Sequence, residues 1–432
     1  MSRFALLAAA ALVAFAAPAV AQDFVMVNAT VATGDGSAPI ADGVVVVDAG
    51  KVVYAGPRAG AGSLPATAVY DLGGKWITPG VFMAVTDLGL ADVEGVADSN
   101  DTRSTRSRFS AALDASVAVN YASQHVAVSR AGGVTRATIV TSPGGAIFAG
   151  QGALIDTGAD KDAVVATRMF QMVTLGEAGA RIAGGSRVAA YAELANALRE
   201  AGEFAAGRWR GEGNLLTRAD AEALGQVVTG AQPLYVQVER AADIRAVLGL
   251  RQQYPKLRLV LVGVSEGWIV AREIAAAGVP VIADPLENLP ASFEQLGATH
   301  SNVGRMAAAG VKVALGGLSG GITGPRTAPQ FAGNLVALSR VPGATGLTWG
   351  QAFASISSVP AEISGFGGRY GVLKAGAVAD LVVWDGDPLE VSSAPVQVFI
   401  DGIEQPLDNH QTRLRERYRD LDESALPKAY DW

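Results

Sequence analysis

Four acidic residues stand at or just after the ends of short hydrophobic runs: Asp87, Glu239, Glu266 and Asp284. When parallel strands close into a barrel, side chains at such positions gather at one mouth. Carboxylate oxygens suit Mg²⁺ or Ca²⁺ rather than zinc, and a carboxylate pair can act as general acid and general base. Salt bridges or solvation are the alternative for all four. Among them, Asp87 and Glu239 are the candidates for a catalytic role.

Other reactive side chains are scarce in this chain. The 432 residues contain three histidines, His125, His300 and His410, and no cysteine. A zinc site normally draws several His or Cys ligands together, and these three histidines lie far apart in the sequence. We therefore expect each to be a surface or hydrogen-bonded residue. A Ser-His-Asp constellation, a cysteine nucleophile and disulfides are not expected either.

Length and composition indicate a large globular α/β protein. Half of the residues are hydrophobic, 52 are glycine, and the net charge is −7 with acidic and basic residues mixed along the chain. Such a chain can fill one large barrel and an accessory domain. The charge pattern excludes a basic nucleic-acid surface, so no nucleic-acid partner is expected.

The first 21 residues are typical of a signal peptide. Arg3 precedes an apolar run over residues 4–17, and Ala19-Val20-Ala21 fits a small-x-small cleavage site. The run is too short for a membrane span of about 20 residues. We therefore expect cleavage near Ala21, secretion to a bacterial periplasm, and no membrane span in the mature chain.

The remaining chain divides into β-rich ends and an α/β centre. Residues 22–78 and 371–406 contain β-branched runs separated by turn residues, which predicts one small composite β-sandwich. Residues 79–370 alternate strands and helices, which favours a (β/α)₈ TIM barrel. Its expected strands include residues 134–140, 233–238, 257–264, 279–283 and 311–317. Residues 407–432 form a charged tail with a surface helix.

Two glycine-rich segments lie where loops over the barrel mouth are expected. Residues 141–156 either line a pocket with backbone or make a tight structural excursion. Residues 316–325 form either a mobile lid or a plain connection. Neither segment is a phosphate-binding loop, because no Lys-Ser/Thr pair opens a helix after it.

Several segments resemble one known family. They are DGVVVVDAGKVVYAGP, GGKWITPG, AGGVTRATIV and PAEISGFGGRYGVLKAGAVADLVVWDGDPLE, in that order along nearly the whole mature chain. The chain is similar to periplasmic, imidazolonepropionase-like members of the amidohydrolase superfamily. This resemblance implies a distorted TIM barrel with a composite β-sandwich. It also implies zinc or another divalent metal, whose activated water hydrolyses non-peptide carbon–nitrogen bonds.

The positions of the family's metal ligands carry other residues here. The His-x-His pair on strand 1 corresponds to Val85 and Asp87, and the strand 5 ligand to Gln237, with Glu239 two residues later. The strand 6 position falls within residues 262–264, which have no ligating side chain. The strand 8 aspartate corresponds to Leu318. The resemblance therefore implies a degenerate metal site, no bound metal, and a pocket lined by Val85, Asp87, Gln237, Glu239 and Leu318.

Three functions stay open at this point. The chain is a hydrolase of the resembled family, or an enzyme that uses carboxylate chemistry in the barrel mouth. Alternatively it is a non-catalytic binding or scaffold protein, a homo-oligomer or the partner of a ligand-complete amidohydrolase. A small-molecule ligand fits the first two functions, and the sequence does not specify which molecule it is.

Overall fold

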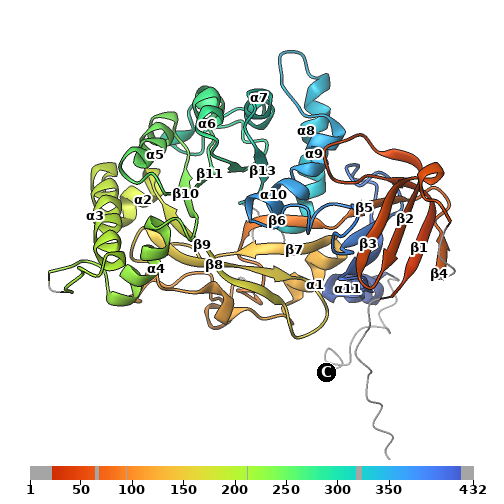
Figure 1. The fold of residues 1–432 in the computed structure, drawn as a ribbon, viewed down its shortest axis with the longest axis horizontal. Coiled ribbons are helices and arrows are strands. Elements are labelled where there is room, and N and C mark those ends of the chain that lie inside the picture. Colours follow the sequence, from red (N-terminus) through yellow and green to blue (C-terminus); the bar gives the residue numbers. More distant parts are fainter. Residues whose placement is uncertain (1–21, 64–67, 94, 212, 318–323, 420–432) are drawn as a thin grey trace, which may run out of the picture.

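The computed structural model describes residues 22–63, 68–93, 95–211, 213–317 and 324–419. The expected signal peptide, Leu318 and the end of the tail lie outside these ranges. Two eight-stranded sheets organise the described chain (Figure 1). One is the barrel sheet, and the other is a sheet built from both ends of the chain, called the end sheet below.

The end sheet joins the N-terminal strands to the C-terminal ones. Its order is β16-β15-β14-β5-β1-β2-β3, and β4 also pairs with β1. The central contact is between β5 and β14, which pair antiparallel. The predicted composite β-domain from both chain ends is therefore confirmed. Its strands are β1 Phe24–Val31, β2 Ile40–Asp48, β3 Lys51–Pro57, β4 Ala68–Asp71, β5 Trp76–Pro79, β14 Leu381–Trp384, β15 Pro395–Ile400 and β16 Ile403–Glu404.

The barrel sheet runs in sequence order from β6 to β13. A parallel bridge between Ala84 and Gly316 brings its two edges together, so the predicted α/β barrel is confirmed. Its strands are β6 Val81–Thr86, β7 Val134–Ile139, β8 Phe148–Asp156, β9 Val164–Thr174, β10 Leu234–Val238, β11 Leu259–Gly263, β12 Val281–Ala283 and β13 Val313–Leu315.

One strand departs from the expected all-parallel pattern. Strand β8 is antiparallel to both β7 and β9. Every residue of β8 is buried, because Phe148, Leu154 and Ile155 pack in the barrel wall. The interpretation of residues 141–156 as one glycine-rich loop was therefore wrong for its second half. Only residues 140–147 connect the two strands at the mouth.

Helices cover the outside of the barrel (Figure 1). Apolar residues on their inner faces and on the outward faces of the strands form the largest core cluster. A smaller cluster fills the barrel interior, where the Phe170 and Tyr235 rings stack with centroids 4.1 Å apart. None of the helices in the described ranges is long and apolar enough to cross a membrane. The helices are α1 Gln124–Ala131, α2 Gly176–Ile182, α3 Arg187–Ala205, α4 Arg218–Val228, α5 Ala241–Gln253, α6 Ala271–Ala277, α7 Asn302–Ala308, α8 Ala328–Ala337, α9 Trp349–Ala354, α10 Ser358–Ile363 and α11 His410–Tyr418.

A buried ionic cluster joins the barrel to the end sheet. Arg136 on β7 is 2% exposed and donates to both carboxylate oxygens of Asp380, at 2.7 and 3.1 Å. Its guanidinium also lies 2.8 Å from Asp401 and 3.4 Å from Asp156. The ring of Tyr370 covers the guanidinium, with its centroid 4.5 Å from the central carbon. These residues come from distant parts of the chain, so the cluster fixes how the two sheets meet.

Gly80 stands where the chain passes from β5 to β6, and its backbone nitrogen donates to the Asp380 carbonyl at 2.9 Å. A Cβ at this position would lie 2.1 Å from Thr135 Oγ1 and 2.3 Å from its methyl group. We expect Gly80→Ala to lower the free energy of unfolding by about 1–3 kcal/mol, as overpacking does. Urea unfolding measures this loss. The control is Gly202→Ala within α3, where a Cβ meets open space and helix propensity favours alanine by up to about 1 kcal/mol. An unchanged midpoint for Gly80→Ala would contradict the close packing.

Candidate functional site

A pocket of about 470 Å³ opens at the carboxyl ends of the barrel strands. Val85, Asp87, Gln237 and Glu239, four of the residues singled out in the sequence, line this mouth pocket together. The fifth, Leu318, lies outside the described residues. Asp284 lines the pocket as well, and sequence reasoning missed two further residues of its wall, Glu287 and Gln295. Both come from the loop after β12, where no hydrophobic pattern distinguishes an inward side chain from an outward one.

The backbone at the end of β6 is strained. Val85 has φ of 58°, a left-handed conformation that β-branched residues rarely adopt. The pairing of β6 with β7 shifts register at this point, and Val85 N–H donates instead to Thr138 Oγ1 at 2.9 Å. Val264, just after β11, has a similar φ of 54°. Such strain costs on the order of 1–3 kcal/mol per residue and is concentrated at functional sites. The strain therefore marks the pocket rim as a candidate site independently of its side chains.

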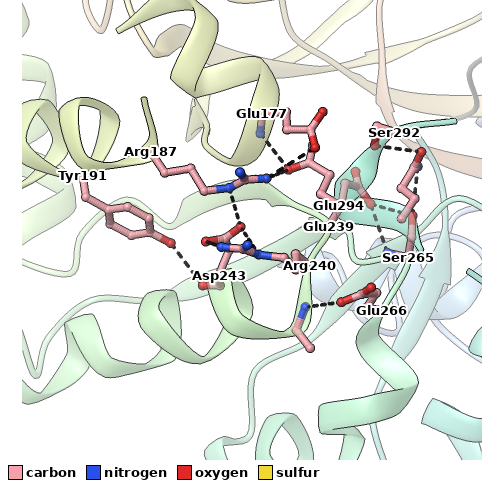
Figure 2. Close-up of polar contacts among 12 residues, drawn as sticks. Glu177, Arg187, Tyr191, Glu239, Arg240, Asp243, Ser265, Glu266, Ser292 and Glu294 are labelled. Carbon is pink, nitrogen blue, oxygen red and sulfur yellow. Dashed lines mark hydrogen bonds and ion pairs between the residues drawn. The ribbon is translucent and has the colours of Figure 1, made fainter. Parts of the chain in front are cut away.

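Two glutamates of the pocket wall contact the hydroxyl of one buried serine. Ser265 Oγ lies 2.8 Å from Glu239 Oε2 and 2.8 Å from Glu287 Oε2. Figure 2 shows Glu239 beside Ser265, whose backbone N–H also donates to Glu239 at 3.0 Å. A hydroxyl has one proton and can donate to only one carboxylate at a time. If one of the two carboxyl groups is protonated, it donates to Ser265 Oγ while Ser265 donates to the other carboxylate. Both short contacts are then hydrogen bonds.

The protonation of Glu239 follows from its surroundings. Burial is the largest effect and raises the pKa of Glu239 to about 7, since the two bonds from Ser265 oppose the shift only in part. The negative charges of Glu287 and Glu294 make a smaller upward contribution to this same pKa. Gly263 lets the carboxyl group sit against the backbone, because a Cβ there would lie 2.1 Å from Glu239 Oε1. Glu239 is thus poised to gain or lose a proton near neutral pH.

Gln237 presents an amide to the same pocket. Its Oε1 accepts a hydrogen bond from Thr174 Oγ1 at 3.1 Å. Because this contact orients the amide, its nitrogen is the end left to donate toward a ligand. The carboxyl group of Glu239, just after β10, and the amide of Gln237, near the end of that strand, both line the mouth pocket.

An ion-pair network supports the loop that carries Gln295. Arg187 lies 3.0 Å from both Asp243 and Glu294 (Figure 2). Glu294 also accepts from the backbone N–H of Glu177, at 2.7 Å, at the start of α2. The neighbouring Gln295 then donates to Glu287 Oε2 at 2.7 Å. The network thus holds the loop so that Glu287 faces the mouth pocket.

Glu266 does not belong to the pocket, contrary to its place among the acidic candidates. Its carboxylate accepts from the backbone N–H groups of Ala241, at 2.9 Å, and of Gly297, at 3.0 Å. The first contact caps the start of α5, where a negative charge is favourable. Glu266 therefore positions backbone and has no oxygen directed at the mouth pocket.

The three histidines lie apart. His125 is buried in α1, His300 precedes α7, and His410 is the exposed first residue of α11. None of the three lines the mouth pocket. Within the described ranges, no group of three or more His, Cys, Asp or Glu side chains is arranged to hold a metal ion. The donors of the mouth pocket therefore do not fit the zinc centre that the resemblance implies.

Parts of the sequence match known proteins. The sequence pattern of the Amidohydrolase family matches residues 269–403. A stretch of 60 residues is 55% identical to amidohydrolase tasK of Hapsidospora irregularis, covering 14% of this chain and 6% of that protein. Another stretch of 73 residues is 40% identical to imidazolonepropionase of Caulobacter vibrioides, covering 16% of this chain and 18% of that protein. The matches thus span only a small part of either relative.

Solved structures share the whole fold. An amidohydrolase from Thermotoga maritima has a TM-score of 0.76 with 23% identity, over 88% of this chain and 99% of that one. An adenosine deaminase from Xanthomonas campestris with bound zinc has a TM-score of 0.53 with 16% identity, over 94% and 99%. The fold is thus a TIM barrel with an accessory β-domain. Together with the sequence matches, it shows that this chain belongs to the amidohydrolase superfamily.

Proposed function

We propose that the mouth pocket binds a small molecule through a basic group and that Glu239 is the carboxyl group that exchanges a proton when it binds. This proposal is based mainly on the position of the single Ser265 hydroxyl, which lies between Glu239 and Glu287. We further propose that this chain acts without the metal centre implied by its resemblance, because the donors of the pocket do not fit zinc.

The charge of the pocket selects the ligand class. Its ionisable side chains in the described part of the chain are Asp87, Glu239, Asp284 and Glu287, and all of them are acidic. Residues 318–323, which the structure does not describe, read LSGGIT and add no ionisable group. A guanidinium or ammonium ion forms short, charge-assisted hydrogen bonds with carboxylates. An anionic ligand would be repelled by these carboxylates.

Hydrolysis of a carbon–nitrogen bond is the second candidate. Glu239 with a pKa near 7 can accept the proton of an attacking water and pass it to the leaving nitrogen. The Gln237 amide can donate to the carbonyl oxygen of the same bond. Release of the free guanidine and the carboxylate from an N-acylguanidine, assayed after chelation of metals, distinguishes hydrolysis from binding alone. Turnover that survives chelation and is lost in Glu239→Gln supports hydrolysis, whereas binding without turnover supports a binding protein.

Binding of butylguanidine tests the proposed function. The guanidinium group stays protonated throughout the neutral range, so only the protein titrates. By calorimetry near pH 8, we expect Glu239→Gln to weaken binding by about tenfold or more, because a charge-assisted bond becomes a neutral one. The matched control is Glu273→Gln on α6, an exposed carboxylate paired with Arg245. Equal affinity of the wild type and Glu239→Gln would overturn the proposal.

Secretion, homo-oligomer formation and pairing with a ligand-complete amidohydrolase remain predictions from the sequence. Co-purification from the native cell would test the pairing, and N-terminal sequencing of the mature protein would test cleavage near Ala21.

A further inference from the structure

A second cavity, called the side cavity here, lies next to the mouth pocket and encloses about 630 Å³. Ser142 lines both cavities, and Thr141 and Pro143 face the mouth pocket while Gly144 and Gly145 face the side cavity. The connection between β7 and β8 is therefore a common wall of the two spaces.

A close approach of two segments builds this wall. Ser142 N–H donates to the Thr102 carbonyl at 2.7 Å. A Cβ on Gly144 would lie 1.9 Å from the Ser104 carbonyl oxygen, so only glycine permits this contact. The glycines noted in the sequence thus position the segment that contains Ser104, Ser107 and Ser110 beside the mouth.

The side cavity has a mainly uncharged lining. Ala189 and Ala192 on α3, with Leu113, Phe109 and Phe148, give it an apolar surface, and serine hydroxyls add neutral polar groups. One of its two acidic residues, Asp220, already accepts hydrogen bonds within the protein. One of its oxygens accepts from the N–H groups of Ser110 and Ala112, at 2.9 and 2.8 Å, and the other from Thr217 Oγ1.

Two further charged side chains, Glu193 and Arg108, line the side cavity, which stays mainly apolar and uncharged. Glu193 accepts a hydrogen bond from the backbone N–H of Ile147 at 3.3 Å, at the start of β8. Arg108 is exposed, and its guanidinium carbon lies 5.7 Å from the centre of the Phe109 ring. Both contacts leave the apolar lining from α3 and Leu113 open to a ligand. An uncharged aryl or alkyl group fits this surface better than a second ion.

We propose that the side cavity is a second subsite for the same ligand, which then has a basic head in the mouth pocket and an aryl or alkyl group in the side cavity. The assignment of the basic head depends on the proposed function. The assignment of the apolar group depends on the shared wall and on the lining of the side cavity. The ligand class is thus an elongated, arylalkyl or alkyl guanidine or amine.

A pair of probes separates the two subsites. We expect 4-phenylbutylguanidine to bind about tenfold to a hundredfold more tightly than butylguanidine, as burial of a phenyl ring predicts. Ala192→Phe on α3 places a ring in the side cavity and should abolish this difference while the affinity for butylguanidine stays unchanged. The matched control is Ala195→Phe, exposed on the same helix but outside the lining, which should keep the difference.

The outcomes distinguish the two proposals. Butylguanidine binding that depends on Glu239, with no gain from the phenyl group, would overturn the side-cavity subsite and leave the proposed function intact. A gain from the phenyl group that persists in Ala192→Phe would also overturn the subsite. Absence of any guanidine binding that depends on Glu239 would overturn the proposed function instead.

Discussion

Replacing Arg136 by Met is expected to lower the free energy of unfolding by about 3–5 kcal/mol, the cost of removing one partner from a buried ion cluster. The variant leaves Asp380, 1% exposed, without its bidentate partner. Asp156 and Asp401 lose the same counter-charge. Since these contacts join β7 to the end sheet, the loss should affect the whole domain junction. Chemical denaturation of both proteins measures the difference.

Lower pH should partly rescue this variant. Burial already raises the pKa of Asp156 to about 6 although Arg136 opposes the shift, and loss of the arginine raises the pKa further. A carboxyl group whose pKa is raised on folding favours the folded state as pH falls through that value. The deficit of Arg136→Met should therefore shrink as the pH is lowered toward about 6, because Asp156 then binds a proton in the folded variant before it does so in the folded wild type. Arg245→Met, which removes only an exposed pair with Glu273, should lose less than about 1 kcal/mol. Equal losses in the two variants would contradict the importance of the buried cluster.

The affinity for butylguanidine is expected to depend steeply on pH. Burial raises the pKa of Glu239 to about 7, and a guanidinium ion binds the ionised carboxylate. Below that pKa, the ionised fraction falls about tenfold for each pH unit, so the affinity should fall by the same factor. Above the pKa, Glu239 is already ionised and the affinity should level off. Calorimetric titrations across this range measure the profile. In Glu239→Gln the step near pH 7 should disappear, whereas in Glu273→Gln it should remain.

Much of the fold could be predicted because its signals are local. The β-branched runs at both ends and the strand–helix alternation after residue 230 predicted the end sheet and β10 to β13 correctly. The long strand β9 and helix α3 were missed. Strand β8 was mistaken for a loop, because its glycines Gly150 and Gly152 are typical of turns. In the fold these glycines allow close contacts instead, Gly150 with Leu113 and Gly152 with the Phe170 ring.

The candidate site could be predicted only in part. Strand ends indicated Asp87 and Glu239, since side chains at carboxyl ends of strands face one mouth. Gln237 was indicated only by the resemblance to the amidohydrolases. The partner of Glu239 could not be found this way. Arg240 and Arg245 are its neighbours in sequence, yet they pair with Asp243 and Glu273. Glu239 instead contacts Ser265, which also contacts Glu287. This arrangement depends on how the segments after β10, β11 and β12 meet, and no local pattern in the sequence indicates it.

Proton release on binding is the most direct test of the role of Glu239. Calorimetry of butylguanidine binding in two buffers of different ionisation enthalpy gives the number of protons released. With a pKa of about 7, Glu239 is half protonated at that pH, so binding should release about half a proton per ligand. The value should approach zero about two pH units higher and in Glu239→Gln at any pH. Binding without proton release at neutral pH, or equal release from wild type and Glu239→Gln, would contradict the role of Glu239.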